Sequence, residues 1–159
     1  MQQKSLSKWI KVIILVMAIC GFLIFTVIFP VIGKDIIEEY PVLSDRFWPW
    51  LIFFWALGVS YYITLYFGWK IADNIGEDRS FSHENAIYLK YVSWIEAIDA
   101  LFIFCVNVIY LVIKLSHPAI ALLSLLVVFV AIAISVFFAS LSHLVEKAAA
   151  MKDENDLTI

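Results

Sequence analysis

The sequence predicts an all-α fold: an integral membrane four-helix bundle with its N-terminus and its C-terminus in the cytoplasm. The main observation is four long apolar runs, at residues 12–32, 50–67, 94–113 and 119–141. Each run reaches or approaches the roughly 20 residues that cross about 30 Å of hydrocarbon. The composition agrees, because 64% of the residues are hydrophobic, whereas soluble domains hold roughly 45–50%. We therefore predict one membrane domain over residues 1–159, with spans at about 10–32, 48–70, 91–114 and 118–143, a cytoplasmic loop at about 71–90 and a cytoplasmic tail at about 144–159.

The orientation follows from lysine and arginine, which are retained on the cytoplasmic side during insertion. Eight of these residues flank the spans on the side of the two termini, and three lie in the connections on the other side. Both termini are therefore predicted to be cytoplasmic. Aromatic residues near the span ends form the belts expected at headgroup depth, namely Trp9, Tyr40, Trp48, Trp50, Trp69 and Trp94.

The first span is predicted to be retained rather than cleaved as a signal peptide. Its apolar run of about 21 residues exceeds the roughly 7–15 of a signal-peptide core, and no small-x-small cleavage site follows. Ile19 precedes Cys20 at a position where a lipoprotein signal requires a small residue. Pro30 is expected to kink this span near its outer end.

The second and fourth spans carry small residues, which let helix backbones approach closely in lipid. In the second span these are Ser60, Thr64 and Gly68. In the fourth span a longer stripe falls on one face at about 100° per residue. Its members are Ala121, Ser124, Ala131, Ser135, Ala139 and Ser142. We expect both sets to be helix-packing surfaces, because small residues drive association in membranes without any further role.

The cytoplasmic loop has the residues of a capped helix connection. Gly76 is expected to end the second helix at the C′ position, and Ser82 to cap a helix that begins at His83. Phe81 is placed to pack onto that helix near residues 86–87.

The third span carries a polar stripe within a sector of about 80°, formed by Glu96, Asp99, Asn107, Tyr110 and Lys114. Lipid is an unfavourable neighbour, because a carboxylate at helix centre costs about 2.5–3.5 kcal/mol. Two interpretations stay open for the two acids. They form either a proton or cation site facing a cytoplasmic vestibule, or a buried clamp that fixes helix register through hydroxyls of Ser60, Tyr61 or Thr64. Lysines of neighbouring helices could pair with them, the candidates being Lys8, Lys11 and Lys70.

The tail continues the fourth helix and then ends in an acidic segment followed by Leu-Thr-Ile. Such ends usually fray, but a short acidic segment with a free carboxylate also suits docking into a partner's groove or sheet edge. The residues predicted to contact a partner, in the loop and the tail together, are Gly76, Phe81, Ser82, Asn85, Asp156, Leu157 and Ile159.

The sequence contains no catalytic motif: no glycine-rich phosphate loop, no His-Glu-x-x-His and no Gly-x-Ser-x-Gly. Its three histidines are spread over two connections and one helix end, and both cysteines lie inside apolar runs. We predict no enzymatic activity, no cofactor and no bound metal. The net charge of -3 without a basic block argues against direct nucleic-acid binding.

A Gly-x-x-x-x-Phe-Ser-x-x-Asn arrangement at Gly76, Phe81, Ser82 and Asn85 is followed by Leu-Lys, and the chain ends Glu-Asn-Asp-Leu-Thr-Ile. With the four spans, these features resemble an uncharacterised, domain-of-unknown-function family of small bacterial four-helix membrane proteins. The resemblance covers nearly the whole chain. It implies a gene neighbourhood with a small helix-turn-helix regulator, and hence a membrane partner for a transcription factor, but it supplies no catalytic residue. The loop departs from the expected shorter or more basic turn at Glu77-Asp78-Arg79.

We therefore predict a small non-enzymatic protein of the bacterial plasma (inner) membrane, a sensor or anchor that controls a cytoplasmic helix-turn-helix regulator. Its expected surroundings are the lipid bilayer, with a homo-oligomer left open. One alternative is a small proton-coupled or cation-coupled transporter. Another is an immunity or envelope-stress protein whose acidic outer loop meets a cationic peptide, through Asp35, Glu38, Glu39 and Asp45.

Overall fold

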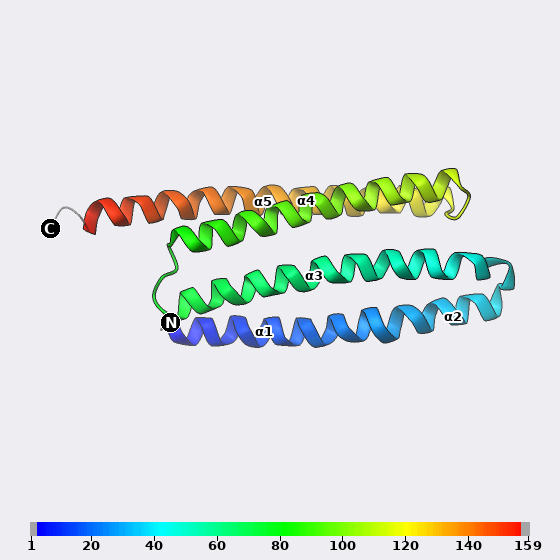
Figure 1. The fold of residues 1–159 in the computed structure, drawn as a ribbon, viewed down its shortest axis with the longest axis horizontal. Coiled ribbons are helices and arrows are strands. Elements are labelled where there is room, and N and C mark those ends of the chain that lie inside the picture. Colours follow the sequence, from blue (N-terminus) through cyan, green and yellow to red (C-terminus); the bar gives the residue numbers. More distant parts are fainter. Residues whose placement is uncertain (1–2, 157–159) are drawn as a thin grey trace.

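The computed structural model describes residues 3–156, and these form long helices that run back and forth (Figure 1). The first span is a continuous helical rod of three parts: α1 (Gln3–Leu23), a π-helical segment η1 (Ile24–Ile28) and α2 (Phe29–Glu39). A 3-10 segment, η2 (Pro41–Arg46), leads into α3 (Phe47–Gly76). The last two helices are α4 (His83–Val112) and α5 (Pro118–Asp156). The described residues contain no strand, and four helical stretches are long and apolar enough to cross a membrane, which confirms the predicted all-α class.

The disturbance expected at Pro30 takes the form of the π segment that ends just before Phe29. Proline has no N–H to donate, and its ring clashes with the carbonyl four residues earlier, here that of Thr26. A wider helical turn relieves this clash. The Thr26 hydroxyl lies in the same turn and donates to the carbonyl of Phe22 at 2.6 Å.

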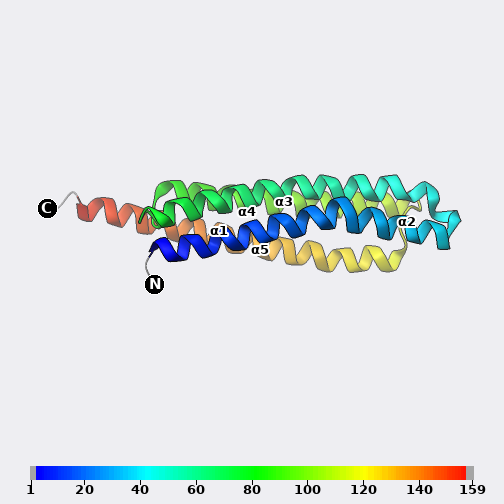
Figure 2. The ribbon, with the colours of Figure 1, turned by 90° about the horizontal axis from the view of Figure 1, so that it is seen from below.

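The helices form two antiparallel hairpins, α1–α3 and α4–α5, which meet along α3 and α4 (Figures 1 and 2). Among residues 3–156, the Cα atoms of α1 and α5 do not come within 8 Å of each other. The start of α1 and the end of α5 lie at one end of the molecule, as an even number of antiparallel spans requires (Figure 1). We call this the terminal end (residues 74–90 and 144–156) and the opposite one the distal end (residues 29–50 and 113–120).

The α1–α3 hairpin is held by glycines that receive aromatic rings. At Gly21 an added Cβ would collide with the ring of Tyr61, and at Gly58 it would lie 3.2 Å from the ring of Phe25. Tyr61 donates its hydroxyl to the carbonyl of Met17 at 2.8 Å, and Tyr62 donates to Ala18 at 2.8 Å. The rings of Tyr61 and Phe25 therefore fill the space left by the missing side chains, and the two tyrosine hydroxyls bond the α1 backbone.

The α4–α5 hairpin is held by serines. Ser135 donates to the carbonyl of Ser93 at 2.8 Å, and Ser142 donates to that of Ala86 at 2.7 Å. All three serines are buried. Small hydroxyl side chains allow the close backbone approach that association in lipid requires.

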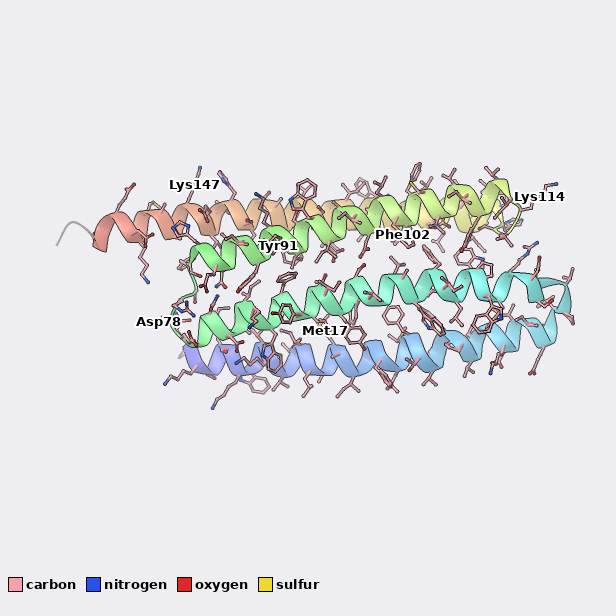
Figure 3. All side chains as sticks on the ribbon, in the orientation of Figure 1. Met17, Asp78, Tyr91, Phe102, Lys114 and Lys147 are labelled. Carbon is pink, nitrogen blue, oxygen red and sulfur yellow. The ribbon has the colours of Figure 1, made fainter. Side chains whose placement is uncertain are left out.

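Aromatic rings fill the seam between the hairpins. Phe53 of α3 stacks on Phe102 of α4 with ring centroids 5.6 Å apart, and Phe67 lies 5.3 Å from Tyr91. Figure 3 labels Tyr91 and Phe102 on α4. Away from these contacts the helices present large apolar side chains outward; Leu122 is 70% exposed and Phe129 69%. A hydrocarbon surrounding accommodates such a surface, whereas water would not.

Candidate functional site

The terminal end is the strongest candidate site, because the loop at residues 77–82 and the last turns of α5 lie there together (Figure 1). The α5 helix projects past the start of α4 (Figures 1 and 2). Figure 3 labels Asp78 in the loop and Lys147 on α5. Most of the residues predicted to contact a partner belong to this region.

The loop turns at Asp78, which has φ 62 in the left-handed region. The prediction that Gly76 would occupy this position, C′, is wrong: Gly76 is the last residue of α3, and no glycine of the described chain has a positive φ. Aspartate can adopt the left-handed conformation at small cost. Gly76 is required for a different reason, since a Cβ there would lie 2.9 Å from the Ser7 hydroxyl of α1.

Asn85 is buried and organises the loop from below, with 2% of its surface exposed. Its side-chain nitrogen donates to the carbonyls of Ser80 at 3.0 Å and Arg79 at 3.3 Å. Its side-chain oxygen accepts from the amide of Asn74 at 2.9 Å. Asn85 thus ties the end of α3, the loop and the start of α4 together, and it shapes the surface from inside.

Arg79 reinforces the same loop with charge. Its guanidinium pairs with Glu77 at 2.6 Å and Glu84 at 3.3 Å, and it donates to Asn74 at 3.0 Å. The hydrogen bond to Glu77 raises the pKa of Arg79 above its ordinary value. The loop is therefore a fixed turn.

Ser82 caps α4 as predicted, because its hydroxyl accepts from the backbone N–H of Asn85 at 3.3 Å. Phe81 does not pack down as expected: 60% of it is exposed. The bonds that Asn85 makes to the loop backbone set the direction of the chain before the cap. They leave an aromatic ring on the surface of the terminal end.

The projecting part of α5 is fastened to the start of α4 by His83. The Nδ1 atom of His83 lies 2.8 Å from Glu146, and its Nε2 atom lies 3.1 Å from Asp153. His83 precedes the apolar part of α4 by about two turns, so it lies outside the membrane span. Hydrogen bonds to the two carboxylates, first Glu146 and then Asp153, raise the pKa of His83, because both ring nitrogens donate when the imidazole is protonated.

The structure describes the predicted tail as far as residue 156. Asp156 is the last described residue and ends α5. The predicted partner contacts Leu157 and Ile159 lie outside the described residues. Below the tail, Val145 and Ala149 are buried, so the early part of the extension is packed rather than frayed.

The two acids of the third span, Glu96 and Asp99, are half-buried in α4. Ser60 of α3 faces Asp99. Within residues 3–156 neither acid forms an ion pair. The expectation that lysines would reach them is not met: Lys11 pairs with Asp73 at 2.6 Å, and Lys70 lies over a tyrosine ring.

The rest of the polar stripe has separate roles. Asn107 is buried and donates to the carbonyl of Ile103 in its own helix at 2.9 Å, while its Oδ1 atom has no partner among the described residues. Tyr110 donates to Pro49 of α3 at 2.7 Å. Lys114 does not continue the helical face, because α4 ends at Val112 and Lys114 adopts φ 60 to enter the turn.

The predicted packing residues lie mostly at helix contacts. On α5, Ser135 and Ser142 are buried and Ala121, Ser124 and Ala131 are half-buried, whereas Ala139 is exposed. Those on α3 divide between two neighbours: Gly68 faces Ile14 of α1 and Ser60 faces α4. Thr64 is half-buried with its hydroxyl covered and without a partner in the described chain.

Sequence reasoning missed two features of α1 that hold the hairpin at the terminal end. Ser7 is buried and donates to the carbonyl of Ala72 at 2.6 Å. One turn further along α1, Lys11 forms an ion pair with Asp73 of α3. A signal for the first existed, because Ser7 and Gly21 are two heptads apart and therefore lie on one helical face. No group of three or more potential metal ligands occurs in the part of the chain that the structure describes.

Comparison with known proteins gives a family and a relative. A family described as protein of unknown function (DUF2975) matches residues 31–159. The uncharacterized membrane protein YoaS of Bacillus subtilis (strain 168) is 26% identical over 146 residues, which cover 91% of this chain and 88% of that protein. No solved structure matches the chain. These findings, together with the four spanning helices, identify a multi-pass bacterial membrane protein.

Proposed function

Because the chain belongs to the DUF2975 family of unknown function, we propose a role from the geometry of its terminal end. In this proposal the protein is a small non-enzymatic sensor or anchor that holds a cytoplasmic helix-turn-helix regulator at the terminal end. The observation that carries the proposal is a rigid, partly apolar surface outside the predicted spans. Phe81 on the loop is 60% exposed, and Met151 on the α5 extension is 63% exposed.

The rigidity of this surface supports partner binding. Asn85 fixes the loop through three side-chain hydrogen bonds, and His83 holds the extension through two. A surface that is ordered before binding loses little conformational entropy when a partner docks. Exposed apolar side chains in an aqueous region are a common mark of interaction sites. The predicted cytoplasmic orientation gives a soluble regulator access to both the loop and the α5 extension.

The test is a crosslinking pull-down from native membranes with the full chain and three variants. Phe81→Ser removes the exposed ring, a truncation after Lys152 removes the tail, and Val42→Ser is the matched control. Val42 is 81% exposed at the distal end, so this change alters a comparable apolar surface on the other side. A helix-turn-helix protein is expected with the full chain and Val42→Ser, and much less of it with the other two.

A further variant separates loss of contact from loss of order. The truncation also removes Asp153, which holds His83, so full-length Asp153→Asn is included. If Asp153→Asn behaves like the truncation, the tail acts through the extension rather than by direct contact. Equal recovery of the regulator with every variant, or recovery of no cytoplasmic protein at all, would contradict the proposal.

The second candidate function is proton-coupled or cation-coupled transport. It is favoured by Glu96 and Asp99, two half-buried acids that have no ion-pair partner among the described residues. Acids at this depth are rare without a role. In proteoliposomes Glu96→Gln should abolish flux with the fold intact, and Glu38→Gln, on the exposed part of α2, should leave flux unchanged. If the two acids only fix helix register, neither the unaltered chain nor Glu96→Gln should show flux.

A further inference from the structure

An open cleft of about 540 Å³ lies at the distal end, where the two hairpins meet. It is bounded by α2, η2, α3, the α4–α5 turn and the start of α5. Ile32 and Ile36 of α2 and Ile120 of α5 line it and are 45–50% exposed, so they form an open rim. Leu51 is buried at 5% exposure and forms part of its floor. The lining is therefore mostly hydrocarbon and is open to the surroundings of the helices.

One charged side chain, that of Arg46, lines this apolar cleft. Its Nε atom is covered, and it has no hydrogen-bond partner in the part of the chain that the structure describes. Four acids lie nearby in sequence, yet none within residues 3–156 forms an ion pair with Arg46: Asp35, Glu38, Glu39 and Asp45. No hydrogen bond or ion pair of the Arg46 guanidinium occurs within residues 3–156, so its N–H groups suit an acceptor from outside the chain.

We propose that this cleft binds an anionic phospholipid, with the phosphate at Arg46 and an acyl chain along the apolar lining. The guanidinium fork matches phosphate oxygens in geometry and charge. Trp50 also lines the cleft, and tryptophan favours the headgroup depth at which such a phosphate lies. The exposed isoleucines of the rim give a chain a way in from the bilayer.

The surrounding charge favours a lipid over a soluble anion. Exposed acids on α2 and η2 make the water-facing surface beside the cleft negative, so an anion arriving from solution is repelled. A phospholipid enters along the membrane instead, where burial of its acyl chain offsets the repulsion. The site also differs in place from the terminal end, so its test does not depend on the role proposed there.

The test is native mass spectrometry of the purified full chain in a neutral detergent. Phosphatidylglycerol and phosphatidylcholine with identical acyl chains are added in separate arms, and oleate in a third. We expect one phosphatidylglycerol per chain, held in preference to the other two. Arg46→Gln should weaken this binding about tenfold, since a charge-assisted hydrogen bond is lost. Arg46→Lys should retain part of it.

Lys34→Gln is the matched control, because Lys34 is an exposed cation of the same end that does not line the cleft. It should bind phosphatidylglycerol as the unaltered chain does. If Arg46→Gln fails to fold, Ile36→Trp is used, since a bulky rim residue blocks the chain path and leaves the guanidinium in place. Ile36→Trp should then lower phosphatidylglycerol binding.

Three outcomes would overturn the proposal. One is equal binding of the two phospholipids, which share the phosphate, because it would mean that the negative net charge of the headgroup is not recognised. A second is phosphatidylglycerol binding that Arg46→Gln, or Ile36→Trp in its place, leaves unchanged. The third is a different occupant of the cleft: binding of oleate alone would assign it to a fatty acid, and a dimer free of lipid to a second copy of the chain.

Discussion

The two hairpins reach the same antiparallel arrangement by opposite choices of side chain. Between α1 and α3, large aromatic rings enter glycine gaps, and Tyr61 and Tyr62 donate to carbonyls of the facing helix. Between α4 and α5, Ser135 and Ser142 make the equivalent donations with short side chains. In both hairpins a side-chain hydroxyl bonds the neighbouring backbone.

The comparison shows what replaces hydrophobic association inside a membrane. Lipid tails are as apolar as leucine, so helices gain little by hiding apolar side chains from them. Close packing and interhelical hydrogen bonds supply the difference. An aromatic ring packed against a glycine, and a serine bonded to a facing backbone carbonyl, are two ways to obtain close packing together with a hydrogen bond. The ring contact depends on the shape of both partners, whereas the serine contact depends on a small side chain and its hydroxyl bond.

The largest effect is expected where the hairpins join, at Asn85. Replacing Asn85 with alanine removes three side-chain hydrogen bonds and leaves the carbonyls of Arg79 and Ser80 without their donor. The expected loss is about 2–4 kcal/mol in free energy of unfolding, measured by SDS titration in mixed micelles. Lys90→Ala, at an exposed position of the same helix, is the control and should cost far less. A loss under about 0.5 kcal/mol would show that the loop does not depend on Asn85.

The ring-filled hairpin is expected to tolerate bulk poorly. Gly21→Val places atoms where the ring of Tyr61 lies, which forces the ring or the helix to shift. The expected destabilisation is about 1–3 kcal/mol in the same unfolding assay. Cys20→Val changes the exposed neighbouring position and should be nearly neutral. Equal effects of the two changes would mean that α1 does not pack closely at Gly21.

The contrast between the hairpins also explains how far the sequence could be interpreted. The four spans were predictable because their length and hydropathy are properties of each segment alone. The serine contacts of α5 were within reach too, since Ser135 and Ser142 share one helical face with other small residues. Small size is visible in a sequence without knowledge of the neighbour.

Ring-in-gap packing was not predictable, because it depends on which helix faces which. Gly21 and Tyr61 are far apart in the chain, and their match exists only after α1 and α3 align. The same holds for Arg46, whose isolation follows from the meeting of several elements at the distal end. For the terminal end, the Ser82 cap was predictable from local sequence, whereas the burial of Asn85 required the position of Asn74.

A smaller effect is expected from single hydroxyls, and α5 offers a matched pair. Ser142 donates across the interface to Ala86, whereas Ser140 is exposed and donates within its own helix to Val136. Ser142→Ala should cost about 0.6 kcal/mol and at most about 1.7, as interhelical bonds in membranes typically do. Ser140→Ala should cost less. If Tyr61→Phe costs the same as Ser142→Ala, the two hairpins depend on their hydroxyl bonds equally, and the difference between them lies in packing.

The smallest effect concerns pH and distinguishes the hairpins at the terminal end. The α4–α5 hairpin is fastened there by His83, whose pKa is raised above about 6.5 by hydrogen bonds to Glu146 and Asp153. A raised pKa in the folded state means that the stabilisation is fully present below the unfolded pKa and is lost as the pH rises through the folded one. Deprotonation leaves one ring nitrogen without a proton, so one carboxylate bond is lost and the α5 extension loosens.

Thermal unfolding of the unaltered chain and of His83→Gln at pH 6 and pH 9 measures this contribution. The two proteins should differ in Tm at pH 6 and converge at pH 9. His117→Gln, at the distal end, should show no such convergence. A constant Tm difference between the unaltered chain and His83→Gln at both pH values would mean that the histidine holds α5 by its shape and not by its charge. At the terminal end, charge would then act between α1 and α3, through Lys11 and Asp73, and not between α4 and α5.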